Sequence, residues 1–263
     1  VYWMSGPNKE LFDVNFKDWR SDPEQLYNID KIPNPVLRAT HRQSKKRLLA
    51  YANSQLSKAL DINTLTIGFA RRAATYKRAQ LIFKDVDRLL DIGKGKIQII
   101  FSGKAHPKDE GGKSLIKNII KSSKYFTGHI KIIYLENYNM WLGRLITSGV
   151  DVWLNTPLRP NEASGTSGMK ASLNGVPNLS VLDGWWSEGC IDGVNGWAVG
   201  NPNEISDESD ADHLYNLLEN NVIPSYYGDK DDWSTMMKES IKTGISYTSH
   251  RMVKDYNNQY YKL

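Results

Sequence analysis

The middle of the chain alternates short apolar runs with longer segments in which apolar residues recur at helical spacing. The apolar runs lie at residues 64–69, 97–101, 129–134, 151–154 and 178–182. Short strands separated by helices are typical of βαβ units, in which a parallel sheet is covered on both faces. The pattern therefore predicts an α/β fold built on a parallel sheet. Helices are predicted between the strands at residues 76–92, 113–121 and 138–148.

The two ends of the chain show helical spacing without strand-like runs. A long helix rich in Arg, Lys and Leu is predicted over residues 37–60, and two more helices are predicted over 210–221 and 231–263. A polar segment near Asn201 separates the last helices from the strands. The predicted organisation is a helical lead-in at residues 1–60, a sheet domain at 61–200 and C-terminal helices at 201–263.

The formal net charge of +5 and the pI near 9.0 raise the question of a nucleic acid partner. Lys113, Lys117 and Lys121 recur every four residues, beside an apolar face. This spacing predicts a surface helix with a solvated lysine edge. No basic stripe interleaved with aromatic residues is present, so we expect no nucleic acid partner.

Other features of the composition narrow the class of protein. No stretch of about 18 apolar residues occurs, and we therefore expect no membrane span. Cys190 is the single cysteine, which fits a reducing cytoplasm. The five histidines show no metal-ligand spacing, so no metal site is predicted.

The segment from Arg159 to Lys170, with the sequence RPNEASGTSGMK, carries the strongest chemical signal. Its small residues let a backbone approach a ligand closely, and they lead into a helix predicted at 167–174. The free N–H groups of a helix start suit phosphate, and Lys170, in the predicted first turn, is a counter-charge or an imine former. Composition alone leaves open a glycine-rich turn with a surface lysine.

A second constellation follows the first predicted strand, where Arg71, Arg72, Lys77 and Arg78 lie within eight residues. Arginine forks bind phosphate oxygens in a bidentate way, and lysine adds a point charge. Cations at a helix start oppose the helix dipole unless an anion is present. We therefore favour a phosphate-binding function over a solvated helix start.

Aromatic residues follow two other strands. Tyr138 comes after the third strand and could flank a flat ring or a sugar. Trp185 and Trp186 follow the last predicted strand and lie close to Glu188. Paired tryptophans beside carboxylates serve as sugar platforms, but tryptophan buries a large area and is more often a packing residue. We therefore interpret this pair as packing.

These loops, in this order, resemble the C-terminal half of the glycogen/maltodextrin (α-glucan) phosphorylase family. The run from Glu162 to Asn174 matches the pattern Glu-Ala-Ser-Gly-x-x-x-Met-Lys-x-x-Leu-Asn, which resembles the attachment signature for pyridoxal 5′-phosphate in that family. The forms GFARRxATYKR and LDGWW resemble the shorter bacterial and archaeal enzymes. The resemblance covers residues 1–200 and implies a Rossmann-like sheet with helices on both faces. That sheet would be one half of a two-domain B-type glycosyltransferase architecture, with helical N- and C-terminal extensions.

The resemblance also implies an activity and residue roles. The family reaction is phosphorolysis of terminal α-1,4-glucosidic bonds of glycogen or maltodextrin, which gives glucose 1-phosphate. In the family the cofactor is held by a lysine as an imine, and its phosphate takes part in proton transfer. The implied positions are Lys170 for the imine; Arg71, Lys77, Thr166 and Ser167 for the cofactor phosphate; Arg72 with Lys77 for inorganic phosphate; Tyr138 beside the cofactor; and Glu162, Ser164, Gly165 and Tyr76 for the sugar.

Some positions depart from the animal enzymes, namely Ala74, Thr75, Asn139 and Gly168, which puts their allosteric control in doubt here. Only one sheet fits in 263 residues, and the chain has no initiator methionine. We therefore expect a C-terminal fragment or a separately encoded half, inactive without the missing N-terminal domain. Homo-oligomerisation stays open. The alternatives are a nucleotide-sugar-dependent retaining glucosyltransferase and a non-catalytic glucan-binding fragment that uses Trp185 and Trp186.

Overall fold

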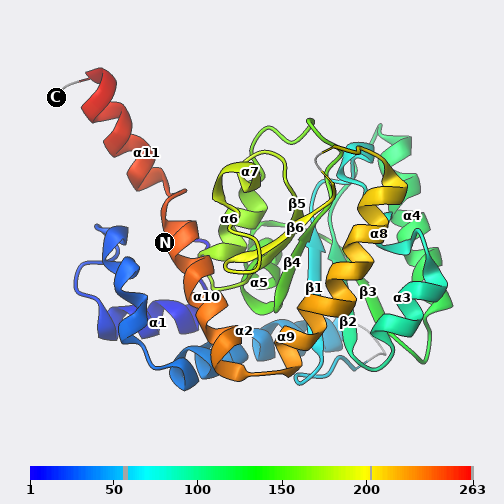
Figure 1. The fold of residues 1–263 in the computed structure, drawn as a ribbon, viewed down its shortest axis with the longest axis horizontal. Coiled ribbons are helices and arrows are strands. Elements are labelled where there is room, and N and C mark those ends of the chain that lie inside the picture. Colours follow the sequence, from blue (N-terminus) through cyan, green and yellow to red (C-terminus); the bar gives the residue numbers. More distant parts are fainter. Residues whose placement is uncertain (56–58, 202, 262–263) are drawn as a thin grey trace.

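A six-stranded parallel sheet lies at the centre of the computed structural model, which describes residues 1–55, 59–201 and 203–261 (Figure 1). The strand order is β3-β2-β1-β4-β5-β6, and every neighbouring pair is parallel. The chain builds outward from β1 in one direction, then returns to place β4 on the other side of β1. The α/β prediction is confirmed. The strands are β1 Leu65–Ala70, β2 Ile97–Ser102, β3 Lys131–Leu135, β4 Val152–Asn155, β5 Asn178–Val181 and β6 Gly196–Val199.

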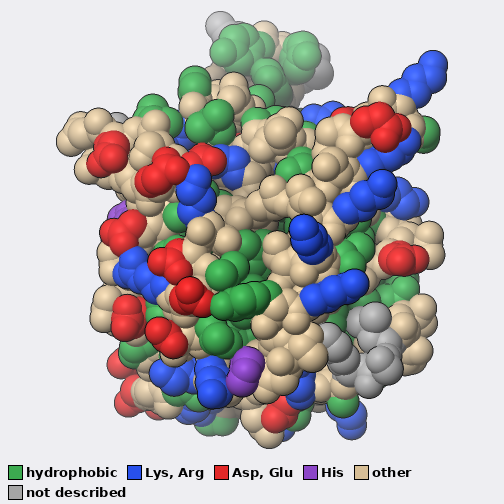
Figure 2. Space-filling view, turned by 90° about the vertical axis from the view of Figure 1, so that its right-hand side faces the viewer, with side chains coloured by type: hydrophobic (Ala, Val, Ile, Leu, Met, Phe, Trp, Pro, Cys, Tyr) green, Lys and Arg blue, Asp and Glu red, His purple; other side chains and the backbone are tan. Residues whose placement is uncertain are grey.

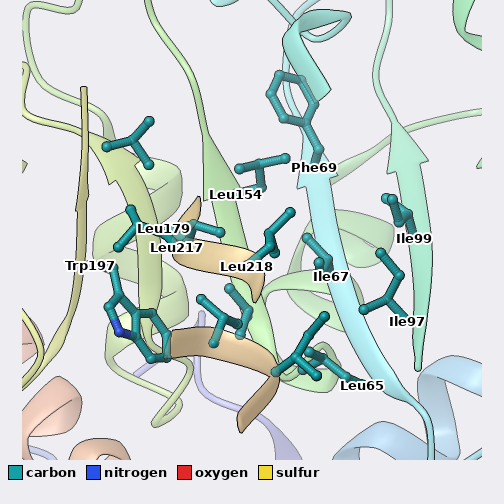
Figure 3. Close-up of a cluster of buried hydrophobic side chains, with 14 of the residues drawn as sticks. Leu65, Ile67, Phe69, Ile97, Ile99, Leu154, Leu179, Trp197, Leu217 and Leu218 are labelled. Atoms are coloured by element: carbon teal, nitrogen blue, oxygen red, sulfur yellow. The ribbon is translucent and has the colours of Figure 1, made fainter. Parts of the chain in front are cut away.

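Alternate side chains of the strands enter two separate hydrophobic clusters, one on each face of the sheet. Ile99 belongs to the larger cluster and its neighbour Ile100 to the smaller one. Figure 3 shows part of the larger cluster, where Ile67 of β1 and Leu154 of β4 lie close to Leu218. Both faces of the sheet are therefore buried, which explains the continuous apolar runs in the sequence.

Helices cover both clusters. The smaller cluster packs under α2, α5 and α6, and the larger one packs under α3, α4, α8 and α9. Helices α1 and α10 also contribute side chains to the larger cluster. The α-helices are α1 Gly6–Asn15, α2 Asn34–Gln55, α3 Val86–Gly93, α4 Glu110–Tyr125, α5 Met140–Gly149, α6 Thr166–Ser172, α7 Trp186–Gly189, α8 Asp207–Leu217, α9 Ile223–Tyr227, α10 Lys230–Ile245 and α11 Ser249–Tyr256. Short 3₁₀ turns lie at Pro23–Lys31, Thr75–Lys77 and Leu81–Phe83, and π-helical turns lie at Leu218–Val222 and Asn257–Tyr261.

The five predicted strands all form, each within about two residues of its predicted limits. The sequence reasoning missed β6, which begins at Gly196 with φ +154°. A Cβ at this position would clash with the Asn178 carbonyl of β5. Glycine is therefore needed for close approach of the two strands, although in the sequence it indicates a turn.

Three helix predictions need correction. The segment 76–92 is not one helix, because Arg78 adopts a left-handed conformation with φ +45° and only α3 is α-helical. The helix predicted at 37–60 ends at Gln55, and its predicted part at 56–58 lies outside the described residues. The helix predicted at 231–263 is divided into α10 and α11, and residues 262–263 lie outside the description.

The surface agrees with the predicted lysine edge. Lys117 and Lys121 of α4 are exposed, while Ile119 is buried. Figure 2, which views the side of the molecule that carries α3 and α4, shows basic and acidic side chains interspersed over much of that face. Helix α11 projects away from the body at the C-terminal end (Figure 1).

The strands lie between Leu65 and Val199, inside the predicted sheet domain, while the domain limits at 60 and 200 stay a prediction. Among the described residues, no helix has both the length and the apolar composition that crossing a membrane requires.

Candidate functional site

The candidate site lies where the strand order reverses, between the carboxyl ends of β1 and β4. In doubly wound sheets this switch point is the usual place for a ligand. An open hollow of about 410 Å³ lies here. It brings together the predicted site residues except Arg78, whose guanidinium pairs with Asp207 and Asp210 instead. Its lining consists of Ala70, Arg71, Arg72, Tyr76, Lys77, Tyr138, residues 161–167 and Lys170.

Glu162 lies between two of the predicted phosphate-binding cations. Its Oε2 accepts a hydrogen bond from Arg71 Nη2 at 2.5 Å and another from Lys77 Nζ. Arg71 also donates to Asn155 Oδ1, at the end of β4. All three charged groups are buried. The sequence assigned Glu162 to sugar hydroxyls and the cations to phosphate, so their mutual contact is a feature that the sequence did not predict.

The carboxyl group of Glu162 is ionised at neutral pH. Burial by itself would raise its pKa, but the hydrogen bond from Lys77 and the charge of Arg71 bring the pKa below its ordinary value. Two buried cations and one carboxylate leave one net positive charge at this point. The adjoining Arg72 is exposed and, among the described residues, forms no ion pair. The hollow is therefore electropositive.

Tyr76 lies against Lys77, whose Nζ is 4.4 Å from the centre of the phenol ring. The hydrogen bond from Lys77 is the main cause that lowers the pKa of Tyr76. Tyr138 also lines the hollow and is half-buried, which raises its pKa. The two phenols therefore lie in different electrostatic surroundings within one hollow.

The cations of the β1 loop do not lie at the start of an α-helix. Arg71 and Arg72 are followed by extended chain and by the 3₁₀ turn Thr75–Lys77, and the next α-helix begins only at Val86. The expected conflict between these cations and a helix dipole is therefore absent. This loop is a candidate site because Arg71 and Lys77 converge on Glu162 and, together with Arg72, line the hollow.

The glycine-rich segment is shaped by close packing. Gly165, with φ +92°, precedes α6 as its N-cap. Trp185 lies beneath the segment and donates its backbone N–H to the carbonyl of Ser164 at 2.8 Å. The hydroxyl of Ser167 is buried and has no hydrogen-bond partner among the described residues. One polar group of the site is thus left without a partner by the protein.

Lys170 lies one turn into α6, as its fifth residue, rather than in the predicted first turn. Its Nζ is 3.7 Å from the centre of the Trp3 ring, and burial lowers its pKa. Asn174 holds this N-terminal segment in place, because its side chain donates to the Trp3 carbonyl at 2.9 Å and accepts from Ser5 N at 2.8 Å. Sequence reasoning missed Trp3, which is 171 residues away from Asn174 along the chain.

Trp185 and Trp186 are buried, with 3% and 0% of their surface exposed, so the packing interpretation is confirmed. They offer no exposed ring face for a sugar. Within the ranges 1–55, 59–201 and 203–261, no group of three His, Cys, Asp or Glu side chains could hold a metal ion.

Comparisons with known proteins give a consistent result. The family model described as carbohydrate phosphorylase matches residues 3–188. The chain is 45% identical to the maltodextrin phosphorylase of Thermococcus litoralis, over 98% of this chain and 34% of that protein. It is 42% identical to the glycogen phosphorylase of Aquifex aeolicus, over 98% of this chain and 42% of that protein. It is 43% identical to the glycogen phosphorylase of Mycobacterium tuberculosis, over 78% of this chain and 25% of that protein. The chain thus spans well under half the length of these relatives.

Proposed function

This chain belongs to the carbohydrate phosphorylase family, and we propose on that premise that it is the C-terminal catalytic half of an α-glucan phosphorylase. The proposed reaction is phosphorolysis of terminal α-1,4-glucosidic bonds of glycogen or maltodextrin, which gives glucose 1-phosphate. One observation carries the proposal beyond family membership. The cations Arg71, Arg72, Lys77 and Lys170 line one hollow that contains a single carboxylate, Glu162.

The residues around the hollow fit pyridoxal 5′-phosphate as the cofactor. Four cations and one carboxylate leave a positive charge that a phosphate group, with a charge of about −2, would largely offset. The Ser167 hydroxyl is buried without a partner, and an incoming phosphate oxygen would supply one. Burial lowers the pKa of Lys170, so more of its amine is neutral at a given pH than in a free lysine. A neutral amine is what covalent attachment of an aldehyde cofactor requires.

Each residue then has a proposed role. Lys170 would hold the cofactor covalently. The phosphate group of the bound cofactor would exchange a proton with inorganic phosphate. Arg71, Lys77, Thr166 and Ser167 would bind the cofactor phosphate, and Arg72 with Lys77 would bind inorganic phosphate beside it. Tyr138 would flank the cofactor. Glu162, Ser164, Gly165 and Tyr76 would orient the sugar.

Glu162 would have a second task, which its contacts support. Without a ligand, its carboxylate separates the like charges of Arg71 and Lys77. Two phosphates in the hollow would compete for those cations, and the carboxylate would then accept hydrogen bonds from sugar hydroxyls. The two buried cations would thus have an anionic partner both with and without ligands.

We further propose that phosphorolysis needs a second domain, outside this chain. The hollow is open, and the chain spans 34% of the maltodextrin phosphorylase of Thermococcus litoralis and 42% of the glycogen phosphorylase of Aquifex aeolicus. The pure chain should release no glucose 1-phosphate from maltodextrin and phosphate. Release at a normal rate would contradict this part of the proposal.

Covalent attachment gives the direct test. The purified chain is incubated with pyridoxal 5′-phosphate, reduced with borohydride and digested, and the modified lysine is identified by mass spectrometry. We expect one stoichiometric adduct at Lys170 and its loss in Lys170→Arg, which keeps the charge. Lys117→Arg, on the exposed surface of α4, is the matched control and should leave the adduct unchanged. Adducts spread over surface lysines, with none enriched at Lys170, would favour the nucleotide-sugar alternative instead.

A further inference from the structure

Asp210 is a fully buried carboxylate outside the hollow, and both of its oxygens bind arginines. Its Oδ2 accepts from Arg78 Nη2 at 2.6 Å, and its Oδ1 accepts from Arg159 Nη2 at 3.2 Å. The side chain has 0% exposure, and it comes from α8, which carries no residue of the candidate site. A buried carboxylate is costly unless its partners are held in good geometry. Here the two partners belong to the two loops that form the site.

Arg78 directly follows Lys77, and its guanidinium is fully engaged. Nε donates to the Thr156 carbonyl at 3.0 Å, and Nη2 donates also to the Pro157 carbonyl at 2.8 Å. Nη1 pairs with Asp207 at 2.9 Å. The arginine thus ties the loop after β1 to the loop after β4 at the residue next to a site cation.

The backbones of the two loops are also joined. The Leu158 N–H donates to the Tyr76 carbonyl at 2.7 Å, and Thr156 Oγ1 donates to the Lys77 carbonyl at 3.2 Å. Arg159, which follows Leu158, starts the segment that carries Glu162, and its Nη2 donates to the Asn201 carbonyl at 3.0 Å as well as to Asp210. Each loop therefore contributes one arginine to Asp210, the carboxylate that both arginines share.

We propose that Asp210 is a positioning residue that sets the distance between Lys77 and the Glu162 segment. This distance in turn determines the affinity of the site for phosphate. Without its charge, Arg78 and Arg159 would be two like charges, with only Asp207 left to offset them. Asp207 is about half exposed and pairs with Arg78 alone. The two loops would then move apart, and the phosphate-binding groups would lose their alignment. The expected effect on phosphate binding rests on the proposed function, whereas the contacts between the two loops do not depend on it.

The experiment compares Asp210→Asn with the wild-type chain in two readouts. The first is the affinity for pyridoxal 5′-phosphate relative to pyridoxal, which lacks the phosphate. We expect Asp210→Asn to lose about tenfold or more in affinity for the phosphorylated compound and to change little for pyridoxal. The second is hydrogen exchange of the Leu158 and Arg78 amides, whose hydrogen bonds join or shape the loops. Both amides should exchange faster in the variant.

Asp212→Asn is the matched control, because Asp212 lies on the same helix and pairs with Arg88, away from the hollow. It should change neither readout. If Asp210→Asn does not fold, Arg159→Gln removes the Arg159–Asp210 contact and leaves the Arg78–Asp210 pair. This variant should change both the affinity and the amide exchange in the same direction, but less.

Unchanged exchange at Leu158 and Arg78 in a folded variant would overturn the positioning role. Failure of the wild-type chain to prefer the phosphorylated compound would instead overturn the proposed cofactor site, while faster loop exchange in Asp210→Asn would still support the link between the loops. The two failures are thus distinguishable.

Discussion

At the scale of single residues, the site is governed by one shared carboxylate. Glu162 pairs with both Arg71 and Lys77, and these three buried groups line an electropositive hollow. A charge of this kind is difficult to remove alone, because its former partners then repel each other. The same arrangement makes the site responsive to added anions.

Glu162→Gln should therefore destabilise the chain and raise its response to phosphate. We expect the free energy of unfolding to fall by roughly 2 kcal/mol, since water in the open hollow screens part of the repulsion between Arg71 and Lys77. On the proposed function, inorganic phosphate binds the folded site alone, and it should then restore more stability in the variant than in the wild type. Urea unfolding with and without phosphate measures both effects.

Glu136→Gln is the control, because Glu136 is exposed beyond the end of β3. It should leave the unfolding midpoint and its response to phosphate unchanged. A Glu162→Gln chain as stable as the wild type, with an identical response to phosphate, would show that the three buried charges are not coupled.

At the scale of elements, α6 and β5 are packed so closely that α6 needs a glycine. A Cβ on Gly168 would lie 2.5 Å from Asn178 Oδ1 and 2.8 Å from Trp185 Nε1. Asn178 also donates to Ser172 Oγ at 2.9 Å, which ties the end of the helix to the start of the strand. The glycine at 168, one of the departures noted in the sequence, is thus explained by contact rather than by loop flexibility.

Gly168→Ala should lower stability although alanine favours helix. The gain in helix propensity is at most about 1 kcal/mol, and overpacking against a buried side chain costs about 1–3 kcal/mol. The matched change Gly111→Ala, in the first turn of α4, meets only Asp109 Oδ1 at 3.4 Å and should be neutral or slightly stabilising. The thermal unfolding midpoint should fall for Gly168→Ala. For Gly111→Ala it should rise slightly or stay unchanged. A stabilised Gly168→Ala chain would contradict the close packing of α6.

The sequence predicted elements better than contacts between them. The strands were predictable because both faces are buried, which gives continuous apolar runs such as Ile97–Ser102. The segment after Tyr76 has helical spacing, but the left-handed Arg78 breaks it, and the side chain of this residue binds Asp210, 132 residues later. Contacts over such separations leave no local pattern. The hollow could be predicted in outline, since its residues follow neighbouring strands, whereas the Glu162 ion pairs and Trp3 could not.

At the scale of the whole molecule, a buried charge cluster joins distant parts of the chain at the opposite edge of the sheet. Asp151, just before β4, accepts from Lys45 of α2 at 2.5 Å and from the Thr66 N–H of β1 at 2.8 Å, and it lies 3.1 Å from His41 Nε2. Lys45 also donates to the Tyr226 hydroxyl of α9 at 3.1 Å. Helices from both ends of the chain thus meet the two central strands through one carboxylate.

This cluster predicts how stability depends on pH. Burial alone would raise the pKa of Asp151, but the charge of Lys45 and the hydrogen bond with His41 bring it below its ordinary value. A carboxyl whose folded pKa is depressed contributes stability above its unfolded pKa of about 3.9, and that contribution is lost as the pH falls through the folded pKa. The acid limb of the stability curve should therefore depend on this residue.

Asp151→Asn should lower the free energy of unfolding at pH 7 by on the order of 3 kcal/mol, because Lys45 stays buried without a counter-charge. Between pH 5 and pH 2 the variant should lose less further stability than the wild type, since the titrating group is gone. Urea unfolding midpoints across this range measure both quantities. Asp232→Asn, at an exposed position of α10, is the control and should follow the wild-type curve. Parallel acid limbs for wild type and Asp151→Asn would show that other carboxylates determine acid unfolding, and that this link between the two ends of the chain and the sheet is not ionic in origin.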